Sequence, residues 1–154
     1  MTESSRTLFR IFYRSRQTPT AAADLDLVVK QIIGTAIRRN REVGVTGLLL
    51  TIQGNFVQAL EGDIDAVRAV YARISMDPRH HDLHVISQGA VETRLFGEWN
   101  MCARALASSD RAILDVIDVK GSFNPGALTA ASAQRLLTAV AAIQRRTANA
   151  ALAG

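Results

Sequence analysis

Short apolar runs separated by turn residues predict five β-strands. The runs lie at 8–13, 45–52, 56–60, 83–91 and 99–103. Only Gln53, Gly54 and Asn55 separate the second run from the third. Because Gly54 and Asn55 tolerate the positive φ of a tight turn, the stretch from 45 to 60 predicts a β-hairpin.

Two stretches with apolar residues at three- and four-residue spacing predict helices over 22–41 and 64–76. Asp63 is the expected N-cap of the second helix. Gly34 lies inside the first helix, where glycine costs ~1 kcal/mol relative to alanine, so we expect close packing to require it. The element order predicts an α+β fold, namely a ferredoxin-like β-α-β-β-α-β sandwich with a fifth strand.

The pattern changes after about residue 105, which divides the chain into 6–105 and a C-terminal extension, 106–154. The extension predicts two helices, a short one over 110–119 and a long alanine-rich one over 128–148. The long helix has an apolar stripe and little polar chemistry. We therefore expect it to cap the open face of the sheet or to form an interface with another subunit.

The composition is that of a globular protein, with 48% hydrophobic residues in 154 positions. The start of the chain lacks the apolar core of a signal peptide, and no apolar run approaches the ~20 residues of a membrane span. Cys102 is the single cysteine, which excludes an internal disulfide and fits a reducing compartment. These features predict a cytoplasmic protein without a membrane partner.

The net charge is +4, but the arginines are scattered, as in Arg38-Arg39 and Arg145-Arg146, and no basic block of five appears. The pattern indicates a solvated basic surface suited to anionic ligands, with no nucleic acid partner.

The usual catalytic and metal-binding signatures are missing. His80, His81 and His84 lie close together, but no second ligand cluster has zinc-site spacing, and we expect His80 and His81 to be exposed. Ser15 and Asp24 could join a histidine in a hydrolytic triad, although nothing in the sequence places them together.

Three polar residues stand out within the predicted elements: Tyr13 in the first strand, Asn40 at the end of the first helix, and Gln58 in the third strand. Considered one at a time, each has an ordinary structural interpretation: a tyrosine with a hydrated hydroxyl, an asparagine that caps the helix C-terminus, and an exposed glutamine. In a sandwich of this topology the first and third strands are neighbours in the sheet. Tyr13 and Gln58 could then point into the same layer, and the first helix could bring Asn40 to the same end.

The ordered motifs of the chain resemble the BLUF family, the blue-light sensors that use FAD. They are FYRSR at 12–16, RRNREVGVTGLLL at 38–50, GNFVQALEG at 54–62, DPRHHDL at 77–83 and RLFGEWNM at 94–101. The resemblance runs from about residue 8 to residue 103 and implies a non-covalently bound flavin, FAD or FMN, in the 6–105 domain.

The resemblance implies roles for ten residues. Tyr13 matches the photoactive tyrosine, Gln58 the switching glutamine, and Asn40 the asparagine that holds the flavin ring. Ser15 is expected near the tyrosine, Ile32 along the ring, Arg39 at the O2 edge where some relatives carry His, and Arg79 and His80 toward the ribityl and phosphate side. Trp99 and Met101 belong to the segment whose Trp or Met can lie beside the glutamine.

The resemblance also implies a mechanism and an output. Light drives transfer of an electron and a proton from Tyr13 to the flavin, and after recombination Gln58 is left rotated or tautomerised with a new bond to O4. The signal leaves through the fifth strand and the C-terminal helices. The expected partners are a downstream protein and further copies of the chain in a homo-oligomer.

Two other functions remain open. A ferredoxin-like acylphosphatase would use an arginine and an asparagine to bind phosphate, and Arg14 and Asn40 are the candidates, although no glycine-rich phosphate loop follows the first strand. An RNA-binding module would need exposed aromatic residues on the sheet, and aromatic residues make up only 5% of the chain. The BLUF resemblance predicts a sensor without enzymatic turnover.

Overall fold

The computed structural model describes residues 7–105 and 124–153. Its elements follow in chain order. They are β1 (Leu8–Gln17), α1 (Pro19–Ala23), α2 (Leu25–Val43), β2 (Thr46–Ile52), β3 (Asn55–Asp63), α3 (Ile64–Ser75), β4 (His80–Ala90), β5 (Cys102–Ala105), η2 (Pro125–Ala127) and α5 (Ala130–Ala153). The predicted α+β fold is confirmed, and the short helix predicted over 110–119 lies outside the described residues.

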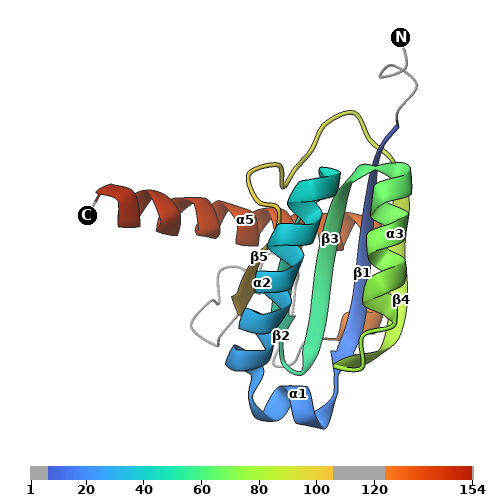
Figure 1. Ribbon diagram of the computed structural model, residues 1–154, viewed down its shortest axis with the longest axis vertical. Helices are drawn as coiled ribbons and strands as arrows, with labels where there is room; N and C mark the ends of the chain where they lie inside the picture. The colour runs from blue at the N-terminus through green and yellow to red at the C-terminus, as the bar shows by residue number, and fades with distance from the viewer. Residues whose placement is uncertain (1–6, 106–123, 154) are drawn as a thin grey trace.

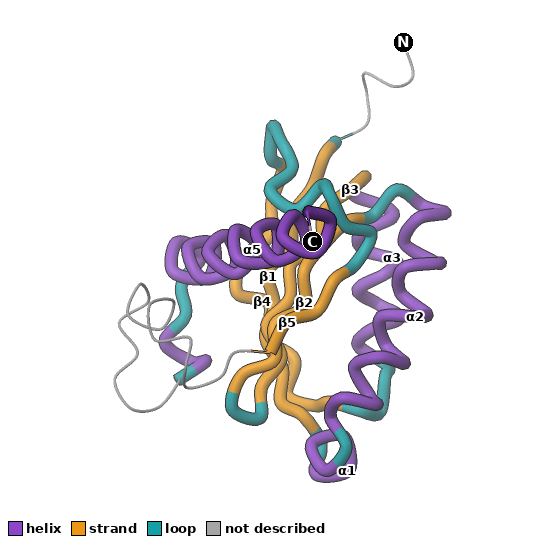
Figure 2. Tube along the Cα trace, turned by 90° about the vertical axis from the view of Figure 1, so that its left-hand side faces the viewer, coloured by secondary structure: helices purple, strands orange, loops and turns teal. Residues whose placement is uncertain are grey.

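The five strands form one sheet in the order β4-β1-β3-β2-β5. β1 runs antiparallel to both β3 and β4, β2 runs antiparallel to β3, and β5 pairs parallel with β2. The helices α2 and α3 cover one face of the sheet, and α5 crosses the strands on the other face (Figures 1 and 2). The predicted adjacency of the first and third strands is therefore confirmed.

The first helical region is divided in two, whereas the sequence predicts one helix over 22–41. Thr18 caps α1 by accepting a hydrogen bond from the backbone N–H of Ala21, and Pro19 occupies the first turn, so helical structure begins earlier than expected. Asp24 then leaves the helical region, with φ −140° and ψ 60°. Gly44, at φ 72°, ends α2 as a left-handed C-cap.

The tight turn of the hairpin uses Gln53 and Gly54, with φ 47° and 80°. The expectation that Asn55 takes a positive φ is therefore wrong. Asn55 begins β3 instead, and its side-chain Nδ2 donates to the carbonyls of Ile52 and Gln53 at 3.3 and 3.0 Å. Positive φ at both central residues matches the right-handed twist of the two strands.

Gly34 is not required by packing, contrary to the expectation from the sequence. A Cβ at this position would meet nothing within 4 Å. We expect Gly34→Ala to raise the free energy of unfolding by ~0.5–1 kcal/mol, because alanine restricts the unfolded chain and favours helix. Urea denaturation measures the change. Gly47→Ala is the contrasting variant, since its Cβ would lie 2.1 Å from the carbonyl oxygen of Ala59 and should destabilise the fold.

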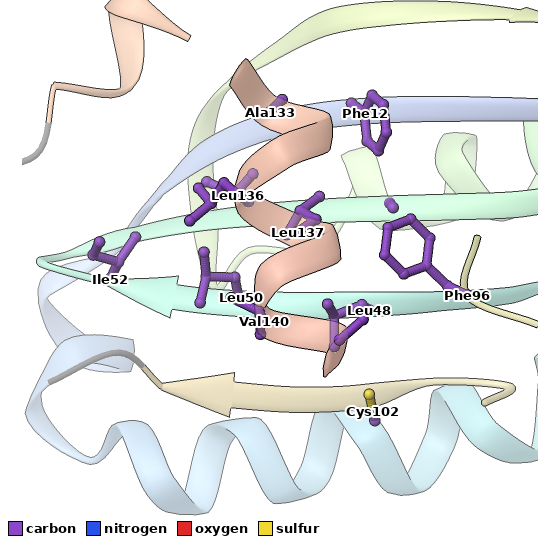
Figure 3. Close-up of a cluster of buried hydrophobic side chains, with 13 residues drawn as sticks. Phe12, Leu48, Leu50, Ile52, Phe96, Cys102, Ala133, Leu136, Leu137 and Val140 are labelled. Atoms are coloured by element: carbon purple, nitrogen blue, oxygen red, sulfur yellow. The ribbon is translucent and has the colours of Figure 1, made fainter. Parts of the chain in front are cut away.

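Two apolar cores lie on opposite faces of the sheet. One fills the space between the sheet and α2 and α3, and includes Phe9, Leu49 and Val67. The other, shown in Figure 3, packs Leu136, Leu137 and Val140 of α5 against strand residues and Phe96. Of the two places expected for the long C-terminal helix, the open face of the sheet and an interface with another subunit, α5 lies on the first. β2 is buried along its whole length.

Candidate functional site

A cavity of about 150 Å³ lies between the sheet and the helices α2 and α3. Its apolar wall comes from both layers and its polar groups converge from strands, helices and the turn before β4. The lining residues are Tyr13, Ile32, Thr35, Ala36, Arg39, Asn40, Leu49, Phe56, Gln58, Val70, Arg73, Ile74, Asp77, Arg79 and His80. A concave, mostly apolar site with a few converging polar groups is typical of a small-molecule or cofactor site.

Tyr13 and Gln58 meet at the wall of this cavity. They are directly opposite each other in the β1–β3 pairing, and the Tyr13 hydroxyl donates a hydrogen bond to Gln58 Oε1. Gln58 Nε2 in turn donates to Met101 Sδ at 3.2 Å. A thioether is a weak acceptor, so within residues 7–105 and 124–153 the amide nitrogen of this buried glutamine has no strong partner.

The Tyr13 phenol is held in its neutral form. Its side chain is only 2% exposed, and burial is the largest cause that raises the pKa of Tyr13 above its usual value. The nearby Tyr71 and Asp77 raise it further. The Tyr71 ring lies edge-on to Tyr13, with centroids 5.2 Å apart. The neutral phenol can therefore keep donating to Gln58 across the ordinary pH range.

A pH titration tests this environment. The chain has two tyrosines, and burial also raises the pKa of Tyr71. We expect the phenolate absorbance of the folded protein to rise less than that of free tyrosine as the solution passes about pH 10, because the pKa of both tyrosines is raised. Above that pH the unfolded chain loses protons that the folded chain keeps, so stability should fall as the pH rises. A full two-tyrosine titration in the folded protein near the ordinary pKa would contradict the buried geometry.

Asn40 is turned into the fold and does not cap its helix. Its side chain is 2% exposed, and Nδ2 donates to the backbone carbonyl of Asn100 at 2.8 Å. Asn100 Nδ2 donates in turn to the carbonyl of Val45 at 3.1 Å. Asn40 thus joins the cavity to the segment that precedes β5. Asn100 was not predicted as a site residue, and its place between Trp99 and Met101 is the one signal in the sequence that could have indicated it.

His80 lies at the cavity with both ring nitrogens engaged, so the expectation that it is exposed is wrong. Nε2 donates to the carbonyl of Ile74 at 2.8 Å, and in the neutral ring Nδ1 accepts from the Ser15 hydroxyl at 2.7 Å. Ser15 is buried beneath His80 and does not line the cavity. A hydrolytic triad is not formed, because the Ile74 carbonyl occupies the position that Asp24 would need. His81 is exposed, as expected.

Three guanidinium groups and one carboxylate line the same cavity. They belong to Arg39, Arg73, Arg79 and Asp77. Arg79 Nε donates to Asp77 Oδ1 at 2.8 Å, and this hydrogen bond is the largest cause that lowers the pKa of Asp77. The excess of positive charge suits an anionic ligand. Asp77 itself was not singled out in the sequence, where its Asp-Pro pair indicated only the end of a helix.

Trp99 lies away from the cavity. It packs with the cluster under α5, on the opposite face of the sheet, and the Arg145 guanidinium carbon lies 5.4 Å from the centroid of its ring. Met101 is buried on the cavity side against Gln58. Of the two candidates in this segment, the structure places Met101 beside the glutamine.

The phosphatase alternative fails on geometry. Arg14 is directly opposite Val57 in the sheet, and Val57 belongs to the cluster under α5. Directly paired residues share a face, so Arg14 and Asn40 lie on opposite sides of the sheet.

Among the described residues, no group of three His, Cys, Asp or Glu side chains could hold a metal ion. None of the described helices is long and apolar enough to span a bilayer.

Comparison with known proteins gives consistent matches. A model of the BLUF family, described as sensors of blue-light using FAD, matches residues 8–102, which is more than half of the chain. The photoactivated adenylate cyclase subunit beta of Euglena gracilis is 39% identical over 97 residues, which are 62% of this chain but only 11% of that protein.

Solved structures agree with the family match. The dark-state structure of BlrB, a BLUF protein, is 31% identical with a TM-score of 0.65, and the match covers 75% of this chain and 87% of that one. The photo-activated state of BlsA is 22% identical with a TM-score of 0.75, covering 84% and 91% of the two chains, and at that identity the likeness shows the fold alone. The chain therefore belongs to the BLUF family, the sensors of blue light that use FAD.

Proposed function

We propose that this chain senses blue light through FAD held without a covalent bond in the cavity between α2, α3 and the sheet. The observation that carries the proposal is the hydrogen bond from Tyr13 to Gln58 at the cavity wall. It places an oxidisable phenol and a reorientable amide in one buried pair. FMN shares the ring and a phosphate, so the same site could take it.

The residues present fit a flavin. Ile32, Leu49 and Val70 supply apolar wall for a planar ring. The Gln58 amide nitrogen donates to a thioether, the one partner recorded for it within the described residues, and has the capacity to donate to a stronger acceptor such as a ring nitrogen or carbonyl. Three guanidinium groups against one carboxylate leave a positive balance for phosphate.

We assign the contacts as follows. Asn40 offers both an amide donor and an acceptor to the carbonyl and N–H edge of the ring, while Ile32 packs along the ring and Arg39 approaches its O2 edge. Arg79 and His80 lie toward the ribityl and phosphate side, and Ser15 holds His80 in place through the bond to Nδ1. Arg79 must share its guanidinium between Asp77 and the ligand.

Bound FAD supplies a light-activated electron acceptor. With the flavin bound, Tyr13 would give one electron and its phenolic proton to the excited flavin and would regain both on recombination. During that interval the Gln58 oxygen loses its donor, so the amide can rotate or tautomerise and adopt new partners. Each exchanged hydrogen bond is worth ~0.5–1.5 kcal/mol net, so the altered arrangement reverts in the dark.

The signal leaves through Met101, which shares a hydrogen bond with Gln58 and directly precedes β5. We propose that residues 6–105 form the sensing domain and 106–154 an extension that relays the change. The output is a protein partner or a change in association between copies, without turnover by this chain. The Euglena relatives are adenylate cyclase subunits, which makes an effector enzyme a reasonable class of partner.

The test is spectroscopic. Purified protein is expected to be yellow, to release FAD on denaturation, and to show a reversible red shift of flavin absorption under blue light. The same preparation is assayed for hydrolysis of an acyl phosphate, which we expect to be absent. A protein that binds no flavin after reconstitution, or binds it without a red shift, would contradict the proposal.

A further inference from the structure

Arg145 joins α5 to the segment that precedes β5. Its guanidinium pairs with the Glu98 carboxylate through Nε, and Nη2 donates to Glu98 Oε1 and to the backbone carbonyl of Leu95, each at 3.2 Å. The same group lies over the Trp99 ring, 5.4 Å from its centroid. One α5 side chain thus contacts three residues of a single five-residue stretch.

That stretch belongs to the 94–101 segment, which also contacts the cavity. Met101 accepts a hydrogen bond from Gln58, and the Asn100 carbonyl accepts one from Asn40. The Trp99 carbonyl accepts from the backbone N–H of Gly47 at 3.0 Å, next to these contacts. The 94–101 segment therefore meets cavity residues on one face of the sheet and α5 on the other.

The rest of α5 contacts the sheet through apolar packing, in contrast to the polar contacts of Arg145. Leu136, Leu137 and Val140 pack into the apolar cluster with Phe96, and such contacts are non-directional. Arg145 instead makes a forked contact whose geometry depends on the positions of Glu98 and Trp99 together. Because the Arg145 and Glu98 side chains are 41% and 47% exposed, their pairing is weak and can open without unfolding the core.

We propose that Arg145 is the positioning residue through which the C-terminal half of α5 follows the state of the cavity. In the dark it holds that half of α5 on the 94–101 segment. A change at Gln58 that displaces Met101 also displaces Trp99 and Glu98, so Arg145 loses its contacts and the end of α5 loosens. The light-dependent part rests on the proposed function, whereas the dark-state contact does not.

Hydrogen exchange of backbone amides in α5 tests the proposal, with Trp99 fluorescence as a second readout, since Trp99 is the single tryptophan. In the dark, Arg145→Gln should speed exchange in the second half of α5 several-fold and alter Trp99 emission, with flavin absorbance unchanged. Arg146→Gln, at the exposed neighbouring position, is the matched control and should behave as the parent protein.

Blue light should speed exchange in the same peptides of the parent protein and of Arg146→Gln, and add nothing in Arg145→Gln. Glu98→Gln should also speed exchange in the second half of α5, and the double variant should exchange no faster there than Arg145→Gln alone. Parent-like exchange of Arg145→Gln in the dark, or additive effects of the two changes, would overturn the proposal. Hydrogen exchange in α5 that does not change under light, in a sample whose flavin absorbance does shift, would also overturn the proposal. Loss of the red shift in the parent protein would instead refute the proposed photochemistry, and the dark comparison would still report on the contact.

Discussion

Replacing Tyr13 with phenylalanine is expected to abolish the light-induced red shift while flavin stays bound. The change removes the oxidisable phenol and the proton that the mechanism requires, and it removes the donor that orients Gln58. Phenylalanine keeps the ring that fills the cavity wall, so the flavin contacts proposed for the lining residues Asn40 and Ile32 should persist. The measurement is the light-minus-dark absorbance spectrum, normalised to flavin content.

Two further variants sharpen this test. Tyr71→Phe removes a second phenol whose ring lies 5.2 Å from that of Tyr13, and it should retain the red shift because it leaves the hydrogen bond from Tyr13 to Gln58 in place. Gln58→Leu should behave like Tyr13→Phe, since leucine cannot exchange hydrogen bonds. A normal photocycle in Tyr13→Phe would show that another group donates the electron and proton.

Replacing Glu61 with alanine is expected to lower the free energy of unfolding by ~3–5 kcal/mol, the range measured when a buried ion pair loses one partner. Glu61 is fully buried and accepts from Arg10 Nε and the backbone N–H of Leu95, both at 2.7 Å, and from the N–H of Phe96 at 2.8 Å. Its removal leaves the largely buried Arg10 charge and two backbone donors without this acceptor.

Urea denaturation of the purified variants measures this loss. Asp82→Asn is the control, because the Asp82 side chain is 69% exposed and its pairing is with His81, which is exposed as well, so we expect a change within ~0.5 kcal/mol. If Glu61→Ala shifted stability by no more than Asp82→Asn, the hydrogen bonds from the backbone of residues 95 and 96 to Glu61 would not hold that segment in place.

The sequence was sufficient to predict the strand order near the site, because that order depends on local patterns. The hairpin follows from the short turn-forming stretch between two apolar runs, and the β-α-β-β-α-β order makes the first and third strands neighbours. Once β1 and β3 pair antiparallel, their register brings Tyr13 opposite Gln58. The motif resemblance selected these two residues from many other polar positions.

Contacts that depend on irregular backbone could not be predicted. Trp99 and Met101 are two residues apart, which in a regular strand would place them on one face, but pairing with β2 starts only at Cys102. The residues before Cys102 do not follow strand geometry, so Trp99 can point toward α5 while Met101 points toward Gln58. The bond from Asn40 to the Asn100 carbonyl is likewise invisible in the sequence, because the acceptor is backbone.

The two edge strands of the sheet, β4 and β5, affect how readily the protein aggregates. Within the described part of the chain β5 has four residues, and the pairing of β4 with β1 is interrupted by two register shifts that distort the ladder. Short or irregular edge strands are poor templates for the addition of a strand from another molecule. We therefore expect concentrated samples to resist fibril growth, and any specific self-association to use helical surfaces.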